Sequence, residues 1–250
     1  MGKRIIQQRR GRGTTTYRAH SFRWKTAVKY RDYDEAEKNS AIKGIVIDLI
    51  HCAGHSAPLA KIKLENGEET FIFAPEGIQT ESVVEVGLNA SIKPGNILPL
   101  KSLPEGTDIF NIEIKPGDGG KLVRSGGTSA KVINKTPESI TLQLPSKKTK
   151  ILQPDCRATI GIVSGAGRSE KPFVKAGNVH HLMRSRGKLY PRTSPGAMNA
   201  GNHPFGSGRG GPTYGGKASN IAPRNAPPGR KVGLLRPKTT GRGKKRNKEE

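Results

Sequence analysis

Three residues that could bind a metal ion lie close together, in the run His51-Cys52-Ala53-Gly54-His55, and Cys156 lies far along the chain. Imidazole and thiolate groups are the usual ligands of Zn²⁺, which structural sites hold with four such groups at short, regular spacings. This run matches none of those spacings, so we expect no metal site and interpret these residues as loop residues near a ligand. The pair His180-His181 lies in a basic run, where ring stacking or phosphate contact is commoner than metal binding.

Two glycine patterns near the C-terminus match nucleotide-binding motifs by spacing alone. Gly206, Gly208 and Gly211 fit G-x-G-x-x-G, and Gly211 to Lys217 fits G-x-x-x-x-G-K. Neither pattern follows a predicted strand or opens a predicted helix, and Ala218 stands where a hydroxyl would bind Mg²⁺. We attribute both matches to chance in a glycine-rich segment.

Arginines and aromatic rings alternate near the N-terminus. Arg9-Arg10-Gly11-Arg12-Gly13 is followed by Tyr17-Arg18 and by Phe22-Arg23-Trp24-Lys25. Guanidinium groups bind phosphates in a bidentate manner, and rings offer stacking platforms for unpaired bases. This combination indicates binding to irregular RNA. The alternative is an amphipathic helix on an acidic surface, which the Arg-Gly alternation disfavours.

The charge that surrounds these residues is unevenly placed. The 250 residues include 44 Lys or Arg and 20 Asp or Glu, a net charge of +24. Residues 1–31 contain 10 basic and no acidic residues, and residues 171–248 contain 18 basic and no acidic residues. Residues 32–170 hold 16 basic and 18 acidic residues. A nearly neutral middle therefore carries two polycationic arms, which favours nucleic acid as the partner over a membrane or an acidic protein.

Composition limits the folded part to the middle of the chain. Only 32% of residues are hydrophobic, and 9 of the 18 prolines and 14 of the 32 glycines lie within residues 171–248. No apolar run approaches the roughly 20 residues of a membrane span, and no signal peptide is recognisable at the N-terminus. Two cysteines form no disulfide framework. We expect an intracellular, reducing compartment.

Short strands separated by Gly and Pro turns fill the middle. The first group contains a hairpin around Asn66-Gly67, and its predicted strands are Gly44–Ile50, Leu59–Leu64, Thr70–Phe73, Ser82–Val86, Ala90–Ile92 and Ile109–Ile114. After a predicted hinge at Lys115–Gly120, the second group comprises Leu122–Val123, Ser129–Ile133, Ser139–Leu144, Thr149–Leu152 and Ala158–Val163. We predict two small β-barrels. Beyond Gly165 the periodicity is lost, and we expect no compact fold there.

Four longer motifs occur in order along the chain. They are Ser56-Ala57-Pro58 with Ala74-Pro75-Glu76-Gly77, Gly119 to Ala130, Cys156 to Gly161, and Ala197 to Gly206. Together they resemble the universal ribosomal large-subunit protein of the L-two family, and the opening Met1 to Gly13 is similar to its archaeal and eukaryotic type. The resemblance spans nearly the whole chain. It implies a mostly β fold, an OB-fold barrel followed by an SH3-like barrel, with long basic extensions ordered on rRNA.

The resemblance also implies roles for individual residues. Arg124 matches a position linked to rRNA binding, and His203 matches a histidine near the peptidyl-transferase centre. Two departures from the family pattern are His55, where many relatives have Arg, and Asn202, which replaces an acidic residue. We interpret His203 as positioning RNA, because no carboxylate lies within residues 171–248 to orient it as a base.

These observations lead to one domain scheme and one set of predicted sites. The domains are a basic arm at 1–37, an OB-fold-like barrel at 38–115, an SH3-like barrel at 116–175 and a Gly/Pro-rich basic extension at 176–250. The predicted rRNA-binding residues are Arg4, Arg9, Arg10, Arg12, Tyr17, Arg18, Arg23, Trp24, Lys25, His55, Arg124, Arg184, Arg186, Arg192, Asn199, His203, Arg209, Tyr214 and Lys217.

We therefore predict a structural, non-enzymatic constituent of the large ribosomal subunit in the cytoplasm. It would support subunit association and the architecture of the peptidyl-transferase region. Its expected partners are large-subunit rRNA, neighbouring ribosomal proteins and small-subunit rRNA at the subunit interface, with no membrane. We expect no intrinsic cofactor, and Mg²⁺ bound by the rRNA nearby. The alternatives are catalytic participation of His203 in peptide bond formation and an RNA-binding translation factor that cycles on and off.

Overall fold

The structure is a computed structural model that describes residues 2–18, 20–207 and 221–235. The chain forms two compact units. One unit is Ser21–Pro172, and the other combines Met1–His20 with Phe173–Glu250. Among the described residues, no helix has the length and hydropathy to span a membrane.

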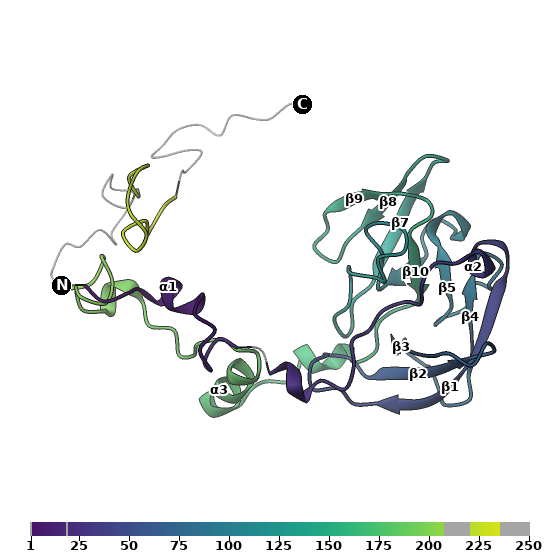
Figure 1. The fold of residues 1–250 in the computed structure, drawn as a ribbon, viewed down its shortest axis with the longest axis horizontal. Coiled ribbons are helices and arrows are strands. Elements are labelled where there is room, and N and C mark those ends of the chain that lie inside the picture. The colour runs from purple at the N-terminus through teal and green to yellow at the C-terminus, as the bar shows by residue number, and fades with distance from the viewer. Residues whose placement is uncertain (1, 19, 208–220, 236–250) are drawn as a thin grey trace. The chain divides into compact units, whose positions relative to one another are not determined.

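The larger unit is built on one continuous sheet (Figure 1). Its strand order is β3-β2-β1-β4-β5-β10-β6-β7-β8-β9. The strands are β1 (Ala41–Ile50), β2 (Leu59–Leu64), β3 (Glu69–Phe73), β4 (Val83–Gly87), β5 (Ile97–Pro99), β6 (Asp108–Phe110), β7 (Ala130–Lys135), β8 (Ile140–Gln143), β9 (Thr149–Leu152) and β10 (Arg157–Ile160). The fold is mostly β, an OB-fold barrel followed by an SH3-like barrel, as predicted.

Most predicted strands are confirmed, and the differences have physical reasons. Leu59–Leu64 and Thr149–Leu152 have the predicted bounds, and the Asn66-Gly67 hairpin joins β2 to β3. Ala90–Ile92 is not a strand, and Leu122 makes only an isolated bridge to Ile112. The strand β5 was missed because it is short and ends in Pro99, a residue that argues against strand structure.

The strand β10 joins the two barrels into one sheet. It pairs with β5 of the first barrel on one side and with β6 on the other. Both pairings are antiparallel. Two short strands that lie close together in sequence therefore pair with the same strand, which comes much later in the chain.

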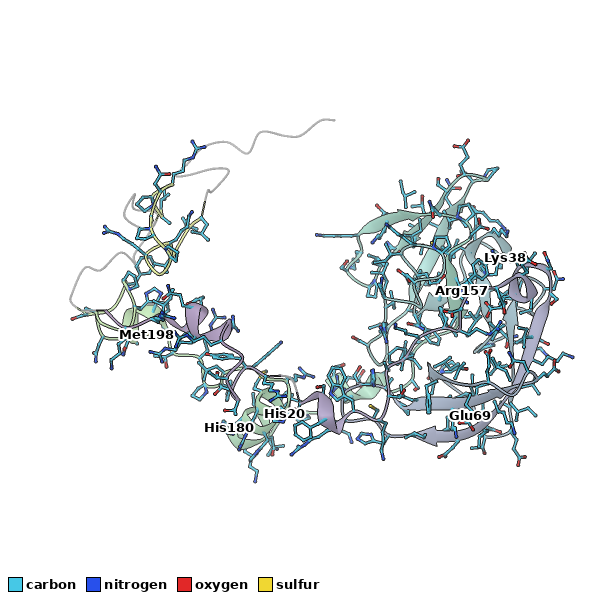
Figure 2. All side chains as sticks on the ribbon, in the orientation of Figure 1. His20, Lys38, Glu69, Arg157, His180 and Met198 are labelled. Atoms are coloured by element: carbon cyan, nitrogen blue, oxygen red, sulfur yellow. The ribbon has the colours of Figure 1, made fainter. Side chains whose placement is uncertain are left out.

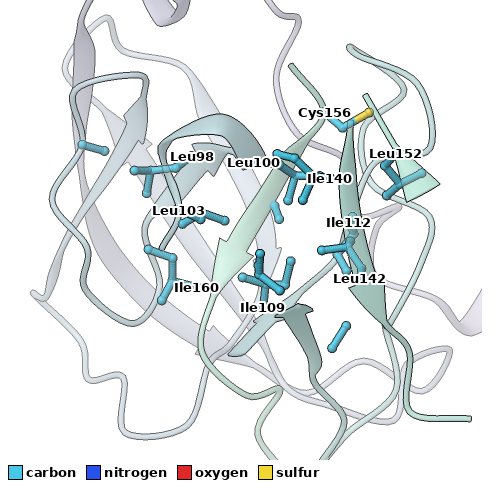
Figure 3. Packing of buried hydrophobic residues seen from close by; sticks show 14 residues of the cluster. Leu98, Leu100, Leu103, Ile109, Ile112, Ile140, Leu142, Leu152, Cys156 and Ile160 are labelled. Atoms are coloured by element: carbon cyan, nitrogen blue, oxygen red, sulfur yellow. The ribbon is translucent and has the colours of Figure 1, made fainter. Parts of the chain in front are cut away.

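Three apolar clusters fill the interior of this unit. One cluster gathers around Val46, Ile62 and Ile72, and another, around Leu100, Ile109 and Ile140, combines residues from both sides of the predicted boundary at 115 (Figure 3). A third cluster, which includes Phe73 and Phe110, contains residues of both barrels. Since a small barrel has a small core of its own, this shared cluster adds burial that neither barrel has alone.

The polypeptide before β1 packs into the same unit. Val28 and Tyr30 are buried, and the Tyr30 hydroxyl lies 2.7 Å from the backbone oxygen of Asn111 and 2.6 Å from Oγ1 of Thr159. The unit begins at Ser21, within the predicted basic arm at 1–37. The physical reason is that apolar and aromatic side chains between the basic residues, such as Val28 and Tyr30, are buried against the barrels.

A buried ionic cluster fastens this N-terminal segment to β10. Arg157, with a side chain 1% exposed, donates from Nη1 to Oε2 of Glu37 at 2.7 Å and from Nη2 to Oε1 of Glu113 at 2.8 Å. The backbone N–H of Arg157 also donates to Glu113, at 2.9 Å. The guanidinium lies against the rings of Tyr30 and Tyr33. Figure 2 labels Arg157 among the strands of this unit.

The predicted hinge at Lys115–Gly120 is a well-bonded turn. Asp118 accepts backbone hydrogen bonds from Ile114 and Gly120, both at 3.1 Å. Glu113 accepts from the backbone N–H groups of Gly117 and Gly119. Because the turn's polar groups are satisfied internally, the segment is a fixed connection between strands.

We expect Gly120→Ala to lower the free energy of unfolding by about 1–3 kcal/mol through backbone strain, because the left-handed backbone of this residue is unfavourable for any side chain. The collision with Asn111 should add to this loss. At Gly120 φ is +83°, and an added Cβ would lie 2.5 Å from Oδ1 of Asn111. The matched control is Gly106→Ala, where φ is +82° and the surrounding space is open. Urea unfolding measures both. Equal losses would mean that the Asn111 contact costs nothing.

The described helices are short. They are the α-helices α1 (Ile6–Arg10), α2 (Glu35–Asn39) and α3 (Ala176–Ser185), and the 3₁₀ helices Ser21–Arg23, Leu100–Ser102, Ala166–Ser169 and Pro195–Ala197. The helix α3 was not predicted, and it lies where we expected no compact fold. Its run Ala176-Gly177-Asn178-Val179-His180 has few strong helix formers, so propensity carried little signal.

Candidate nucleic-acid interface

The unit that contains the two chain ends concentrates exposed cations. Residues of the N-terminal arm contribute Arg4, Arg9, Arg10, Arg12 and Arg18, all of them exposed. The Nε atom of Arg9 donates to the Arg4 carbonyl at 3.0 Å, and the Arg10 guanidinium lies 5.8 Å from the Tyr17 ring centre. None of these arginines forms an ion pair within the described residues.

The N-terminal arm packs against residues from the C-terminal part of the chain. The Lys3 N–H donates to the Gly201 carbonyl at 2.7 Å, and Ile5 is buried with only 6% of its surface exposed. A Cβ on Gly187 would lie 2.9 Å from the Arg18 carbonyl, so this glycine permits a close approach of two backbones. Residues 2–18 and the described residues after Phe173 therefore pack together within one unit.

Two hollows on this unit bring predicted residues together. Arg4, Arg9 and Asn199 line one hollow, and Arg10, Arg192 and His203 line the other. Arg184 lies in the last turn of α3 and Arg186 directly follows it, both exposed to solvent. Figure 2 labels Met198, which lines both hollows, and His180 in α3.

His203 is enclosed by its own chain. Only 6% of its surface is exposed, and its Nδ1 accepts the Phe205 N–H at 3.0 Å. The two rings meet edge to face, 5.2 Å apart. Burial lowers the pKa of the imidazole below its ordinary value. Within the described residues no carboxylate orients this ring. The arrangement therefore fits a residue that stabilises the loop better than one that transfers a proton.

A second group of predicted residues lies on the barrel unit. The His55 ring lies 6.1 Å from Trp24 and 5.4 Å from Phe73, and the Arg124 guanidinium lies 5.0 Å from the Phe73 ring centre. Trp24 is 46% exposed. A Cβ on Gly54 would collide with the Trp24 ring, so glycine allows the ring to lie on this loop. The group presents an exposed indole beside a histidine.

Arg124 is held by its own fold. Its Nη2 donates to the Val28 carbonyl at 2.9 Å and its Nη1 to the Gly120 carbonyl at 3.3 Å. Two of its donors are therefore used inside the protein. The geometry indicates that Arg124 fixes the segment before β1 against the turn at Gly120, next to the exposed Trp24.

Two further predicted residues lie beside this group. The Lys25 backbone N–H lies 3.4 Å from the Cys52 sulfur, which itself lies 3.1 Å from Nδ1 of His55. The Arg23 guanidinium lies 5.5 Å from the Phe22 ring centre. In the described part of the chain no group of three or more potential ligands could hold a metal ion. Arg209, Tyr214 and Lys217 lie outside the described residues.

We expect the His55 titration to have its midpoint below 6.5, because burial and then the nearby Arg124 charge lower the pKa of this imidazole. The unfolded chain then binds more protons than the folded one just below pH 6.5, so stability falls as pH decreases through the folded pKa. NMR titration measures the midpoint, and urea unfolding at pH 5.5 and 7.5 measures the loss. In His55→Gln this part of the pH dependence should disappear. A midpoint above 6.5 would contradict the prediction.

The structure also exposes lysines that the sequence interpretation left out. Lys131 in β7 and Lys148 in the β8–β9 turn are exposed, and Lys150 in β9 is half-buried. None of the three forms an ion pair with another described residue. The missed signal was an excess of lysine in the second barrel, hidden because the middle of the chain is nearly neutral as a whole.

Comparison with known proteins gives a consistent result over both units. The model for the RNA-binding N-terminal domain of ribosomal proteins L2 matches residues 2–86, and the model for their C-terminal domain matches residues 93–227. Large ribosomal subunit protein uL2 of Methanothermobacter thermautotrophicus is 50% identical over 242 residues, which cover 97% of this chain and 99% of the relative.

Other archaeal relatives agree. Large ribosomal subunit protein uL2 of Methanococcus maripaludis strain C6 is 51% identical over 97% of this chain and 100% of its own length. The corresponding protein of Methanocaldococcus jannaschii is 48% identical over 96% of this chain and 99% of its own length. With both family models matched in order on this β architecture, the chain belongs to the ribosomal protein L2 family.

Proposed function

We propose that the protein is a structural constituent of the large ribosomal subunit, in the cytoplasm, and binds large-subunit rRNA. The observation that carries this proposal is the pair of arms with 10 and 18 basic residues and no acid up to Lys248. The described guanidiniums of these arms lie exposed and form no ion pair with another described residue, except Arg31, which pairs with Asp34, Glu37 and Glu68. Family membership and relatives named large ribosomal subunit protein uL2 support the same role.

The finer parts of the proposal concern where the protein acts. The barrels serve as a folded platform, and the arms become ordered on rRNA, where they neutralise phosphates between RNA helices. We also propose contacts with neighbouring ribosomal proteins and with small-subunit rRNA, and a part in subunit association and in the peptidyl-transferase region. Mg²⁺ bound by the rRNA would lie near these contacts, with no cofactor held by the protein itself.

A salt series tests the binding proposal. If about 10 side chains pair with phosphates, the logarithm of the association constant should fall with the logarithm of salt concentration at a slope of roughly −7 to −9. Filter binding to large-subunit rRNA measures it. A nearly flat response would contradict electrostatic binding, and loss of the protein from salt-washed ribosomes would favour a cycling factor.

A catalytic part for His203 is the second candidate, and its burial weighs against it. In reconstituted subunits, His203→Ala should lower the rate constant for peptide transfer by no more than about tenfold relative to the wild-type protein. That is the effect expected of a structural residue, whereas the loss of a general base costs about 10²–10⁴-fold. Protein retention in the subunit is the control. Normal retention together with a loss of about 10³-fold would assign chemistry to this ring.

A further inference from the structure

The arm unit contains an open hollow to which both ends of the chain contribute. Arg4 and Arg9 come from the N-terminal arm, and Thr193, Asn199 and Asn202 come from the loop that follows α3. Its volume is about 330 Å³. Ligand pockets begin at about 300 Å³, so the hollow has room for a small group of a larger ligand. We call it the two-arm hollow.

The polar groups of the two-arm hollow are unused by the protein. The Arg4 guanidinium and the Nη atoms of Arg9 make no hydrogen bond or ion pair within the described residues. The carboxamides of Asn199 and Asn202 are likewise without a partner there. No acidic residue occurs before Asp32 or between Lys171 and Lys248, so neither contributing segment holds a carboxylate.

The backbone that carries these side chains has a defined shape. The Asn199 carbonyl accepts the backbone N–H groups of Asn202 at 2.9 Å and of His203 at 3.2 Å. A Cβ on Gly206 would lie 2.4 Å from the same carbonyl, so only glycine fits there. The Lys3–Gly201 hydrogen bond ties this turn to the segment that bears Arg4. Both carboxamides are therefore held next to the arginines.

We propose that the two-arm hollow binds one phosphodiester of RNA together with the edge of an adjoining unpaired base. Guanidiniums bind phosphate in a fork geometry, and a carboxamide, which both donates and accepts, matches the mixed donor and acceptor edge of a base. An acidic peptide would occupy the arginines, but its backbone N–H and C=O groups point in opposite directions and do not form the adjacent donor and acceptor of a base edge. This assignment rests on the proposed rRNA binding and names a site for it.

Asn202→Asp is the decisive variant, because it restores the acidic residue of the family pattern, which this chain lacks, and places a carboxylate in the same hollow as both guanidiniums. That carboxylate would take the place of the RNA phosphate. We expect affinity to fall about tenfold and the salt slope to become shallower by about 1, the effect of one lost phosphate contact. The probe is a transcript of the large-subunit rRNA of Methanothermobacter thermautotrophicus, whose uL2 is 50% identical to this chain.

Three further variants separate the effect of charge from the effect of shape. Asn178→Asp makes the same charge change on α3 of the same unit, at an exposed position outside the hollow, and should leave the slope unchanged. Asn202→Ala should weaken binding with no change of slope, since it removes a base contact and keeps the phosphate contact. Arg4→Gln/Arg9→Gln, at exposed positions, should make the slope shallower by about 1–2 without any buried change.

The outcomes distinguish this proposal from the proposed function. If the wild-type protein binds with a steep slope but Asn202→Asp behaves like Asn178→Asp, the two-arm hollow is not the site, while rRNA binding stands. If the affinity of the wild-type protein for rRNA does not change with salt concentration, the proposed function itself fails. Binding of a poly-glutamate peptide that is as tight as RNA binding and equally weakened by Asn202→Asp would assign the hollow to an acidic protein and overturn the RNA assignment.

Discussion

Arg157→Gln should lower the free energy of unfolding of the barrel unit by about 3–5 kcal/mol, because it leaves the buried Glu113 without a counter-ion and the buried Glu37 with Arg31 alone. Glu37 and Glu113 are both fully buried and both bind this guanidinium, at 2.7 and 2.8 Å. Glutamine retains hydrogen-bonding capacity and removes the charge, so the loss reports the uncompensated carboxylates. Urea unfolding followed by fluorescence of Trp24 measures it.

The matched control for this experiment is Lys101→Gln. Lys101 pairs with Asp155 at 2.9 Å on the surface, where both side chains are about half exposed. Such a pair contributes at most about 1 kcal/mol, so the control should lose little. Equal losses in the two variants would show that the interior tolerates the Glu113 charge without a counter-ion and the Glu37 charge with Arg31 alone.

The triple variant Arg10→Gln/Arg12→Gln/Arg18→Gln should bind large-subunit rRNA about 100-fold more weakly at about 0.1 M salt, with a slope shallower by about 2. All three arginines are exposed on the N-terminal arm, and no acidic residue precedes Asp32. Each phosphate contact that is lost no longer releases condensed counter-ions from the RNA. The affinity therefore falls and the salt slope becomes shallower at the same time. Filter binding over a salt series measures both quantities.

A second triple variant removes the same net charge from the barrels. In Lys61→Gln/Lys101→Gln/Lys121→Gln each replaced lysine already pairs with a carboxylate, Glu69, Asp155 and Asp118 respectively. We expect a nearly wild-type slope because these ammonium groups are satisfied within the protein. If both triple variants weaken binding equally, total charge governs affinity and the arms have no special part in it.

Local sequence patterns predicted the strands well, because alternation and turn residues act over a few neighbours. The run Leu59–Leu64 and the Asn66-Gly67 turn carry that information within themselves. The strand β5 and the helix α3 lack it, since one ends in proline and the other contains few strong helix formers. Contacts with residues distant in sequence stabilise those segments, and local patterns do not reveal such contacts.

The candidate sites show the same division. Sequence identified the cations Arg4 and Arg9 from composition, but their meeting with Asn199 across the chain has no local signal. Arg157 was noted only as part of a motif. Its partners Glu37 and Glu113 lie far away in sequence, and an arginine within a buried strand was the one hint of an internal ion pair.

The place of β10 between β5 and β6 also determines the order in which the chain can fold during synthesis. The strands β5 and β6 are complete by Phe110, yet the strand that pairs with both begins at Arg157. Until that residue leaves the exit tunnel, two strand edges have unpaired N–H and C=O groups, the feature that promotes association between chains. A nascent chain arrested with Arg157 still inside the exit tunnel should therefore need chaperone protection, whereas one arrested after Val163 has left the tunnel should not.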